Sequence, residues 1–182
     1  FDQIVAHGGT LVSPFALQRI RTIEKALCSP PSVFPGFKTD VATFGPSDTI
    51  GKVVTEMRRH AYSQVPVVKN DGDVIGLLTL DTVARWLACS FESEDDLREM
   101  KAATVKRVLE HAEKFPSGVA PYQVIAKTTT CFDALDKFEK AARERHRLDA
   151  LLITNTGHNR EDIVGIITAW DIPKVLRMAK GK

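Results

Sequence analysis

Three features are scarce or missing in this sequence: long apolar runs, cysteines, and an excess of one charge. No stretch is long enough to cross a bilayer, and no basic start followed by an apolar block predicts a signal peptide. The cysteines are Cys28, Cys89 and Cys131, an odd and widely spaced set that favours reduced thiols over a disulfide framework. We therefore expect a cytoplasmic protein without a membrane span.

The charges nearly balance, and the familiar catalytic and metal-binding motifs are missing. With 25 Lys and Arg against 23 Asp and Glu, the formal net charge of +2 gives no reason to expect binding to nucleic acid. The 5 histidines have no metal-ligand spacing, and the sequence has no Ser-His-Asp arrangement, P-loop or Gly-x-Gly-x-x-Gly motif. We expect no enzyme activity, no metal site and no required cofactor. Whether the chain, which starts with Phe1 rather than Met, is a piece of a longer protein stays open.

What the sequence does contain is one pattern that occurs twice, over residues 49–83 and 130–172. Each copy has a threonine, a helical stripe of apolar residues, an apolar run, a loop, and Gly-apolar-apolar-Thr followed by an acid. The stripe lies at the same offsets from the leading threonine in both copies, as Val53, Val54 and Met57 and as Ala134, Leu135 and Phe138. Such a repeat predicts one supersecondary unit used twice, with the two copies packed on each other.

Periodicity and turn residues predict a β-α-β-β-α order in each copy. The expected segments are 41–44, 49–60, 65–68, 74–78 and 81–88 in the first copy, and 122–126, 131–145, 150–153, 163–168 and 170–179 in the second. A helix at 14–26 precedes the copies, and one insertion helix at 93–114 separates them. The expected divisions are 1–37 for the N-terminal helix and linker, 38–90 for repeat one, 91–119 for the insertion helix and 120–182 for repeat two.

The second copy is the longer one. Thr49 to Gly76 spans 27 positions and Thr130 to Gly165 spans 35. Two of the extra residues are expected before the middle strand and six in the loop at 154–162.

Two segments carry a family resemblance: Tyr62 to Val68 before the Asn70-Asp71-Gly72 turn, and Gly165 to Asp171. Both repeats resemble CBS domains, named after cystathionine β-synthase, and the pair resembles a Bateman module. The resemblance covers about residues 38–90 and 120–178. It implies an α/β (α+β) fold in which the two repeats pack through their sheets about a pseudo-twofold axis. In this family, the two clefts between the repeats often hold adenine nucleotides.

The second repeat ends its last strand at Thr168 and has Asp171 three residues later, at a helix start. A carboxylate there can accept hydrogen bonds from both vicinal hydroxyls of a ribose, and the N–H groups of a helix start suit an anion. The alternative is that Thr168 or Asp171 only caps the last helix, and the two roles are compatible. Together with the resemblance, this pair predicts a nucleotide site.

The first repeat departs from this pattern. Its acid, Asp81, comes one position early, and Thr82 stands where the second repeat has Asp171. A shift of one residue at a helix start turns a side chain by about 100° around the axis. Asp81 is then expected to cap its helix, and the site built on Thr79 and Thr82 is expected to be degraded or altered.

Before the middle strand, His146-Arg147 is expected to stand where the first repeat has Ser63-Gln64. The pair resembles the His-Arg pair that touches phosphates in the gamma subunit of AMP-activated protein kinase, and an arginine fork can bind two phosphate oxygens. A solvated helix end is the other interpretation of Arg147. The family geometry implies composite clefts: Thr168 and Asp171 with Val41, Thr43, Ser63 and Gln64, and Thr79 with Tyr122, Val124, His146 and Arg147.

The resemblance implies a regulatory module that senses AMP, ADP or ATP, with S-adenosylmethionine, NAD and cyclic di-AMP as further candidates. The alternative is a structural dimerisation or interaction module without a physiological nucleotide. A homodimer through the helices at 81–88 and 170–179 is expected, and Trp86 and Trp170 are assigned to packing or dimer contact. The effector that such a module would regulate stays open.

Overall fold

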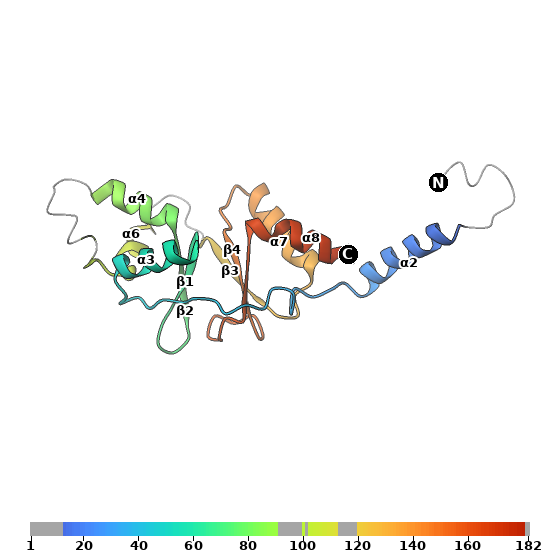
Figure 1. The fold of residues 1–182 in the computed structure, drawn as a ribbon, viewed down its shortest axis with the longest axis horizontal. Coiled ribbons are helices and arrows are strands. Elements are labelled where there is room, and N and C mark those ends of the chain that lie inside the picture. The colour runs from blue at the N-terminus through green and yellow to red at the C-terminus, as the bar shows by residue number, and fades with distance from the viewer. Residues whose placement is uncertain (1–12, 91–99, 101, 113–119, 181–182) are drawn as a thin grey trace.

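The computed structural model describes residues 13–90, 100, 102–112 and 120–180 and has the predicted mixed α/β architecture (Figure 1). The second repeat follows the predicted order of elements, and the first follows it from its first helix onward. Their bounds are Ile50–His60 (α3), Gln64–Val68 (β1), Val74–Thr79 (β2), Leu80–Ser90 (α4), Tyr122–Ala126 (β3), Cys131–Arg143 (α7), Ala150–Thr154 (β4), Gly165–Thr168 (β5), Ala169–Asp171 (the 3₁₀ turn η1) and Ile172–Ala179 (α8). Helix α2 (Pro14–Cys28) precedes the repeats in sequence, and α6 (Val105–Ala112) lies between them.

Each repeat builds its own small sheet. In the second, β3 runs parallel to β4, and β4 runs antiparallel to β5. In the first, β1 pairs antiparallel with β2, but the strand predicted at 41–44 is reduced to one parallel bridge between Phe44 and Val67. The segment just before Phe44 is bound to the second repeat, because the Thr39 N–H donates to Val164 O at 3.4 Å. Residues 40–43 must therefore span the distance from the second repeat to the first, and they cannot also form a ladder with β1.

The helices α3 and α7 end in the same way. Each is followed by a residue in the left-handed conformation, Ala61 or Arg145, with φ of 56° in both cases. The next N–H, that of Tyr62 or His146, then donates to the carbonyl five residues earlier at 2.8 Å. These terminations make His146 the counterpart of Tyr62, whereas the sequence alone had aligned it with Ser63.

The strand register completes this comparison. Gln64 pairs with Thr79 and Ala150 pairs with Thr168, so Ala150 is the counterpart of Gln64. Between equivalent points, three extra residues lengthen α7 and its cap, two lie in the link to β4, and three lie in the hairpin loop. The predicted division into two and six is therefore wrong, as is the equivalence of His146-Arg147 with Ser63-Gln64. An extra helical turn of about 3.6 residues leaves the apolar stripe on the same face, so periodicity could not reveal it.

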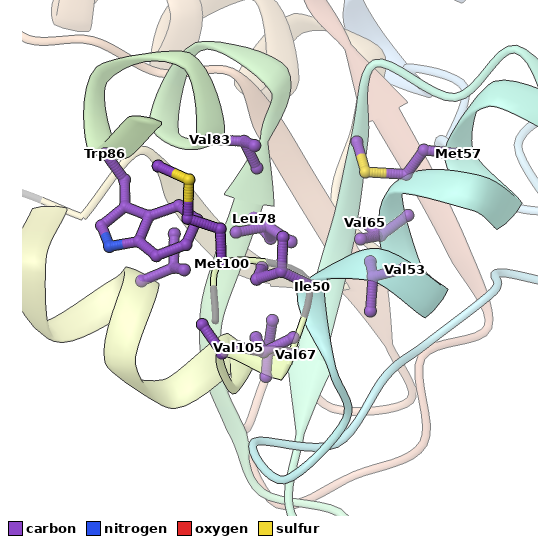
Figure 2. Close-up of a cluster of buried hydrophobic side chains, with 12 residues drawn as sticks. Ile50, Val53, Met57, Val65, Val67, Leu78, Val83, Trp86, Met100 and Val105 are labelled. Carbon is purple, nitrogen blue, oxygen red and sulfur yellow. The ribbon is translucent and has the colours of Figure 1, made fainter. Parts of the chain in front are cut away.

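The core of the first repeat lies between its sheet and helices α3, α4 and α6 (Figure 2). The insertion contributes buried side chains to this core, namely Met100, Ala103, Val105 and Val108. The prediction of one continuous helix over 93–114 is wrong, because the Ala103 carbonyl accepts from Ile50 N at 2.8 Å and Val105 N donates to Asp48 O at 2.9 Å. These bonds use backbone groups that a continuous helix would need. The remainder of that prediction, at 93–99, 101 and 113–114, lies outside the described residues.

The linker before the first repeat packs on the second repeat. Val33 and Phe37 are 0% and 5% exposed in the core of the second repeat. Val33 N donates to Thr129 O at 2.9 Å, and Lys38 forms an antiparallel bridge with Gly165. The chain therefore contacts the second repeat before it enters the first.

The two repeats meet through an apolar cluster flanked by polar contacts. The buried members of this cluster come from β2 and β4 and are Val74, Leu77, Ala150 and Leu152. At the hairpin end of the sheets, Val74 N donates to Asn159 O at 2.9 Å. At the other end, Gln64 Nε2 donates to Asp149 O at 3.1 Å. The repeats are therefore joined at both ends of their strands.

Helix α2 projects away from the second repeat, and none of its residues is buried (Figure 1). Its exposed large apolar residues are Phe15, Leu17, Ile20, Ile23 and Leu27. An isolated helix of 15 residues is marginal in water, so this face is expected to need cover from another surface. Within the described ranges, no helix is both long and apolar enough to span a membrane.

Candidate functional site

The second repeat ends β5 in a closed turn formed by Thr168 and Asp171. Asp171 Oδ2 accepts hydrogen bonds from the Thr168 N–H at 2.8 Å and from Thr168 Oγ1 at 2.9 Å. Both bonds use Oδ2, and Oδ1 of this carboxylate accepts no hydrogen bond from the described part of the chain. The carboxylate therefore closes the turn before α8 and still has an oxygen that can accept a hydrogen bond from a ligand hydroxyl.

The corresponding turn of the first repeat is closed by hydroxyl groups. Thr79, only 3% exposed, accepts a hydrogen bond from the Thr82 N–H at 3.0 Å, and the two hydroxyl oxygens lie 2.9 Å apart. The expectation that Asp81 caps α4 is wrong, because Thr79 makes that bond and Asp81 Oδ2 accepts from Arg85 Nε at 2.9 Å. This turn presents hydroxyls where the other presents a charged acceptor.

Arg147 reaches the first repeat at the Thr79 end. Its Nε donates to Asp149 Oδ1 at 2.9 Å, and its Nη1 donates to Asp81 Oδ2. The structure thus brings Arg147 and the end of β2 together, as the composite cleft implies. Sequence reasoning missed Asp149, because its role depends on the conformation of the link before β4 and on no local pattern. His146 Nδ1 lies 3.7 Å from Glu144 Oε2 on the surface.

The acidic and basic groups in this cluster stabilise one another's charged forms. Burial raises the pKa of Asp81, but hydrogen bonds from Arg85 and then Arg147 outweigh this effect and hold the pKa below its ordinary value of 3.8. Burial also lowers the pKa of Arg147, whereas the hydrogen bonds that Arg147 donates to Asp149 and Asp81 raise it, and the net shift is upward. Asp81 and Arg147 are therefore charged at neutral pH.

The remaining predicted contact residues lie on both sides of the interface between the repeats. Thr43 and Ser63 are exposed, and those that are half-buried are Val41, Gln64, Tyr122 and Val124. Val124 packs against the apolar interface cluster, and Gln64 reaches the second repeat through its bond to Asp149 O. That these residues line two shared clefts stays a prediction.

Two open hollows lie at the hairpin end of the sheets, away from Thr79 and Thr168. One is lined by residues 45–48 and 69–71, and the other by Asp73 and residues 157–161. Neither coincides with the predicted nucleotide clefts, which belong to the opposite ends of β2 and β5. Their position marks the region where the hairpin turn of the first repeat meets the long loop of the second.

That long loop is organised around Glu161. Its carboxylate accepts hydrogen bonds from Thr156 Oγ1 at 2.6 Å and from Thr156 N at 2.7 Å, and these bonds lower its pKa from 4.5 to about 2. The loop contacts the first repeat through Asn159 O and through Arg160 Nε, which lies 3.4 Å from Asp73 Oδ1. Across the described ranges, no group of His, Cys, Asp or Glu side chains is arranged to hold a metal ion.

Comparisons with known proteins identify the family of the chain. The sequence model of the CBS domain matches residues 37–89 and 119–177. The methylated protein MJ0556 of Methanocaldococcus jannaschii is 30% identical over 140 residues, which cover 75% of this chain and 68% of that protein.

Solved structures of CBS proteins share the fold. CbpB in complex with c-di-AMP has a TM-score of 0.58 and 17% identity, with 90% of this chain and 94% of that chain covered. The CBS domain of a bacterial CNNM/CorC family Mg2+ transporter in complex with ATP has a TM-score of 0.54 and 17% identity, with 93% and 99% covered. The CBS domain pair of MJ0100, with 5-methylthioadenosine and S-adenosyl-L-methionine, has a TM-score of 0.56 and 14% identity, with 81% and 96% covered. The chain belongs to the CBS-domain family and carries two copies of that domain in tandem.

Proposed function

We propose that this CBS pair is a regulatory module that binds an adenine nucleotide at the turn formed by Thr168 and Asp171. The observation that carries the proposal is the Asp171 carboxylate, which is fixed to the end of β5 through Oδ2. A ribose presents two hydroxyls that can donate to such a carboxylate in charge-assisted bonds. Related CBS structures that contain c-di-AMP, ATP or S-adenosyl-L-methionine support this ligand class.

Among the candidate ligands, AMP, ADP and ATP come first. In the basic link before β4, the exposed His146 can reach a phosphate of a nucleotide held at Asp171, whereas carboxylates hold Arg147. S-adenosylmethionine, NAD and cyclic di-AMP share the adenosine part and stay in the panel. Regulation requires that the ligand bind one arrangement of the repeats better than another, because equal affinity for both would shift nothing.

A thermal-shift panel with these six ligands tests the proposal, on the parent protein and on Asp171→Ala. At 100 times Kd, a ligand adds about 2.7 kcal/mol to the free energy of unfolding. We expect a selective shift in the parent that Asp171→Ala abolishes. Asp133→Ala is the matched control, because Asp133 accepts a hydrogen bond from the Thr130 N–H in the same way, at the start of α7. Asp133→Ala should lower the melting temperature of the free protein and leave the increase caused by the ligand unchanged. A panel without any shift for the folded parent would refute the proposal.

A second candidate function is an interaction module that forms a homodimer. The observation in its favour is α2, whose large apolar side chains are exposed, with Phe15 at 73% and Leu27 at 70%. A second copy of the chain can cover this face. Light scattering should then show a dimer that the double substitution Ile20→Glu and Ile23→Glu dissociates, while Arg19→Glu on the same helix leaves it intact. A monomeric parent protein would exclude this candidate.

A further inference from the structure

Arg147 is held by carboxylates from both repeats. Its Nε lies 2.9 Å from Asp149 Oδ1 and 2.8 Å from Oδ2, and its Nη1 donates to Asp81 Oδ2. A guanidinium offers two edges with paired donors, one that includes Nε and one that includes Nη1. Each edge already carries a carboxylate. A phosphate can therefore bind Arg147 through two donors only when one of these carboxylates leaves.

The two carboxylates are not equivalent. Asp149 lies two residues from Arg147 in the same link, and its side chain is 19% exposed. Asp81 comes from the other repeat, is 39% exposed, and has a second partner in Arg85. Asp81 is thus the carboxylate that competes with an incoming phosphate, and it is the one that can be displaced.

No such competitor exists at the corresponding position of the second repeat. The strand register that equates Thr79 with Thr168 also equates Asp81 with Trp170, an uncharged side chain that is 87% exposed. The Thr168 end therefore has its acid next to the strand end, where a ribose is expected. At the Thr79 end the acid, Asp81, binds Arg147, where a phosphate is expected.

We propose that Asp81 is a specificity-determining residue, which excludes nucleotide phosphate from the Thr79 end by occupying Arg147. A nucleotide then binds only at Thr168 and Asp171. This inference rests on the proposed function and adds the reason why one of two related clefts is closed to phosphate.

The test is a calorimetric titration with ATP, and with adenosine as the phosphate-free probe. The proteins are the parent, Asp81→Asn, Asp81→Ala, and Asp81→Asn combined with Arg147→Gln. Glu139→Gln is the matched control. It removes the carboxylate of another ion pair on a helix, between Glu139 and Arg143, and changes the net charge by the same amount. Circular dichroism confirms that each variant is folded.

We expect the parent and Glu139→Gln to bind one ATP and both Asp81 variants to bind two. The gained site should bind at least about tenfold more tightly than any second binding to the parent, since a charge-assisted phosphate contact replaces a like-charge repulsion. Adenosine binding should not change, and Arg147→Gln should remove the gained site.

Unchanged ATP binding in the Asp81 variants would overturn the inference, as would a gained site that survives Arg147→Gln or two equal sites in the parent. The two proposals also fail separately. If the parent binds neither ATP nor adenosine but the Asp81 variants bind one ATP, the proposed site at Asp171 fails and the role of Asp81 stands. If the parent binds adenosine but no Asp81 variant gains an ATP, the role of Asp81 fails and the proposed site stands.

Discussion

A shift of one residue separates the chemistry of the two strand ends. In the second repeat the acid is the third residue after Thr168, and it folds back onto the strand end. In the first repeat the acid is the second residue after Thr79, and Arg147 and Arg85 hold it. One residue turns a helical side chain by about 100°. The same local sequence pattern therefore gives a carboxylate that can accept from hydroxyls at the Thr168 end, and an ion pair between the repeats at the Thr79 end.

Glu161 is expected to make the long loop sensitive to acid. Because its pKa is lowered from 4.5 to about 2, its contribution to loop stability is complete above the ordinary pKa and is lost as the pH falls through the folded value. The chemical shift of the Thr156 amide, followed by NMR between pH 5 and about pH 1.5, should therefore titrate near pH 2.

Glu161→Gln should remove this titration, whereas Glu139→Gln on α7 should leave it unchanged. A Thr156 amide that titrates near the ordinary pKa of a glutamate in the parent would contradict the hydrogen bonds assigned to this loop.

At the scale of elements, the insertion is part of the first repeat's core. Helix α6 contacts α4 and β2, and its residues Val105 and Val108 are fully buried. The Ala103 carbonyl accepts from the first N–H of α3 at 2.8 Å, so the insertion also satisfies a helix start that would otherwise face solvent. The first repeat is therefore incomplete without residues that follow it in sequence.

Val108→Ala tests this packing. This substitution removes the two buried γ-methyl groups of Val108. It should lower the free energy of unfolding by about 1.5–2.5 kcal/mol, measured by urea denaturation. Arg107→Ala, on the exposed face of the same helix, should cost less than about 0.5 kcal/mol. Equal effects of the two substitutions would show that α6 does not pack on the first repeat.

At the scale of the whole molecule, the chain passes between the repeats more than once. The linker at 30–38 packs on the second repeat, and the segment after it crosses to the first. The long loop of the second repeat returns through Asn159 to the hairpin of the first. These crossings surround the apolar interface, so the arrangement of the repeats depends on contacts at both ends of the strands.

Gly165→Ala should disturb the first of these crossings. A Cβ at Gly165 would lie 2.1 Å from the Phe37 carbonyl oxygen, so the linker backbone must move. We expect a loss of about 1–3 kcal/mol in unfolding free energy and faster hydrogen exchange of the Val33 amide. Gly45→Ala is the control, since its Cβ would come no closer than 3.7 Å to any neighbour. A Gly165→Ala variant as stable as the parent would contradict this placement of the linker.

Much of the fold could be predicted because its signals are local. The apolar stripes of α3 and α7, their threonine caps and the Asn70-Asp71-Gly72 turn each depend on a few neighbouring residues. The insertion was predicted less well. Its apolar spacing continues through Ala103 and Thr104, but backbone bonds to α3 interrupt the helix there, and periodicity carries no information on such bonds.

The sequence by itself determined the repeat, the order of elements, and the positions of Thr168, Asp171, Thr79 and Asp81, because these depend on side-chain type and spacing along the chain. Only the tertiary structure decided that Asp81 meets Arg147, that Asp149 shares this arginine, and that the linker packs on the second repeat. The physical reason is that these contacts join residues far apart in sequence. Their partners are set by strand register and by the packing of the two sheets, which no local pattern encodes.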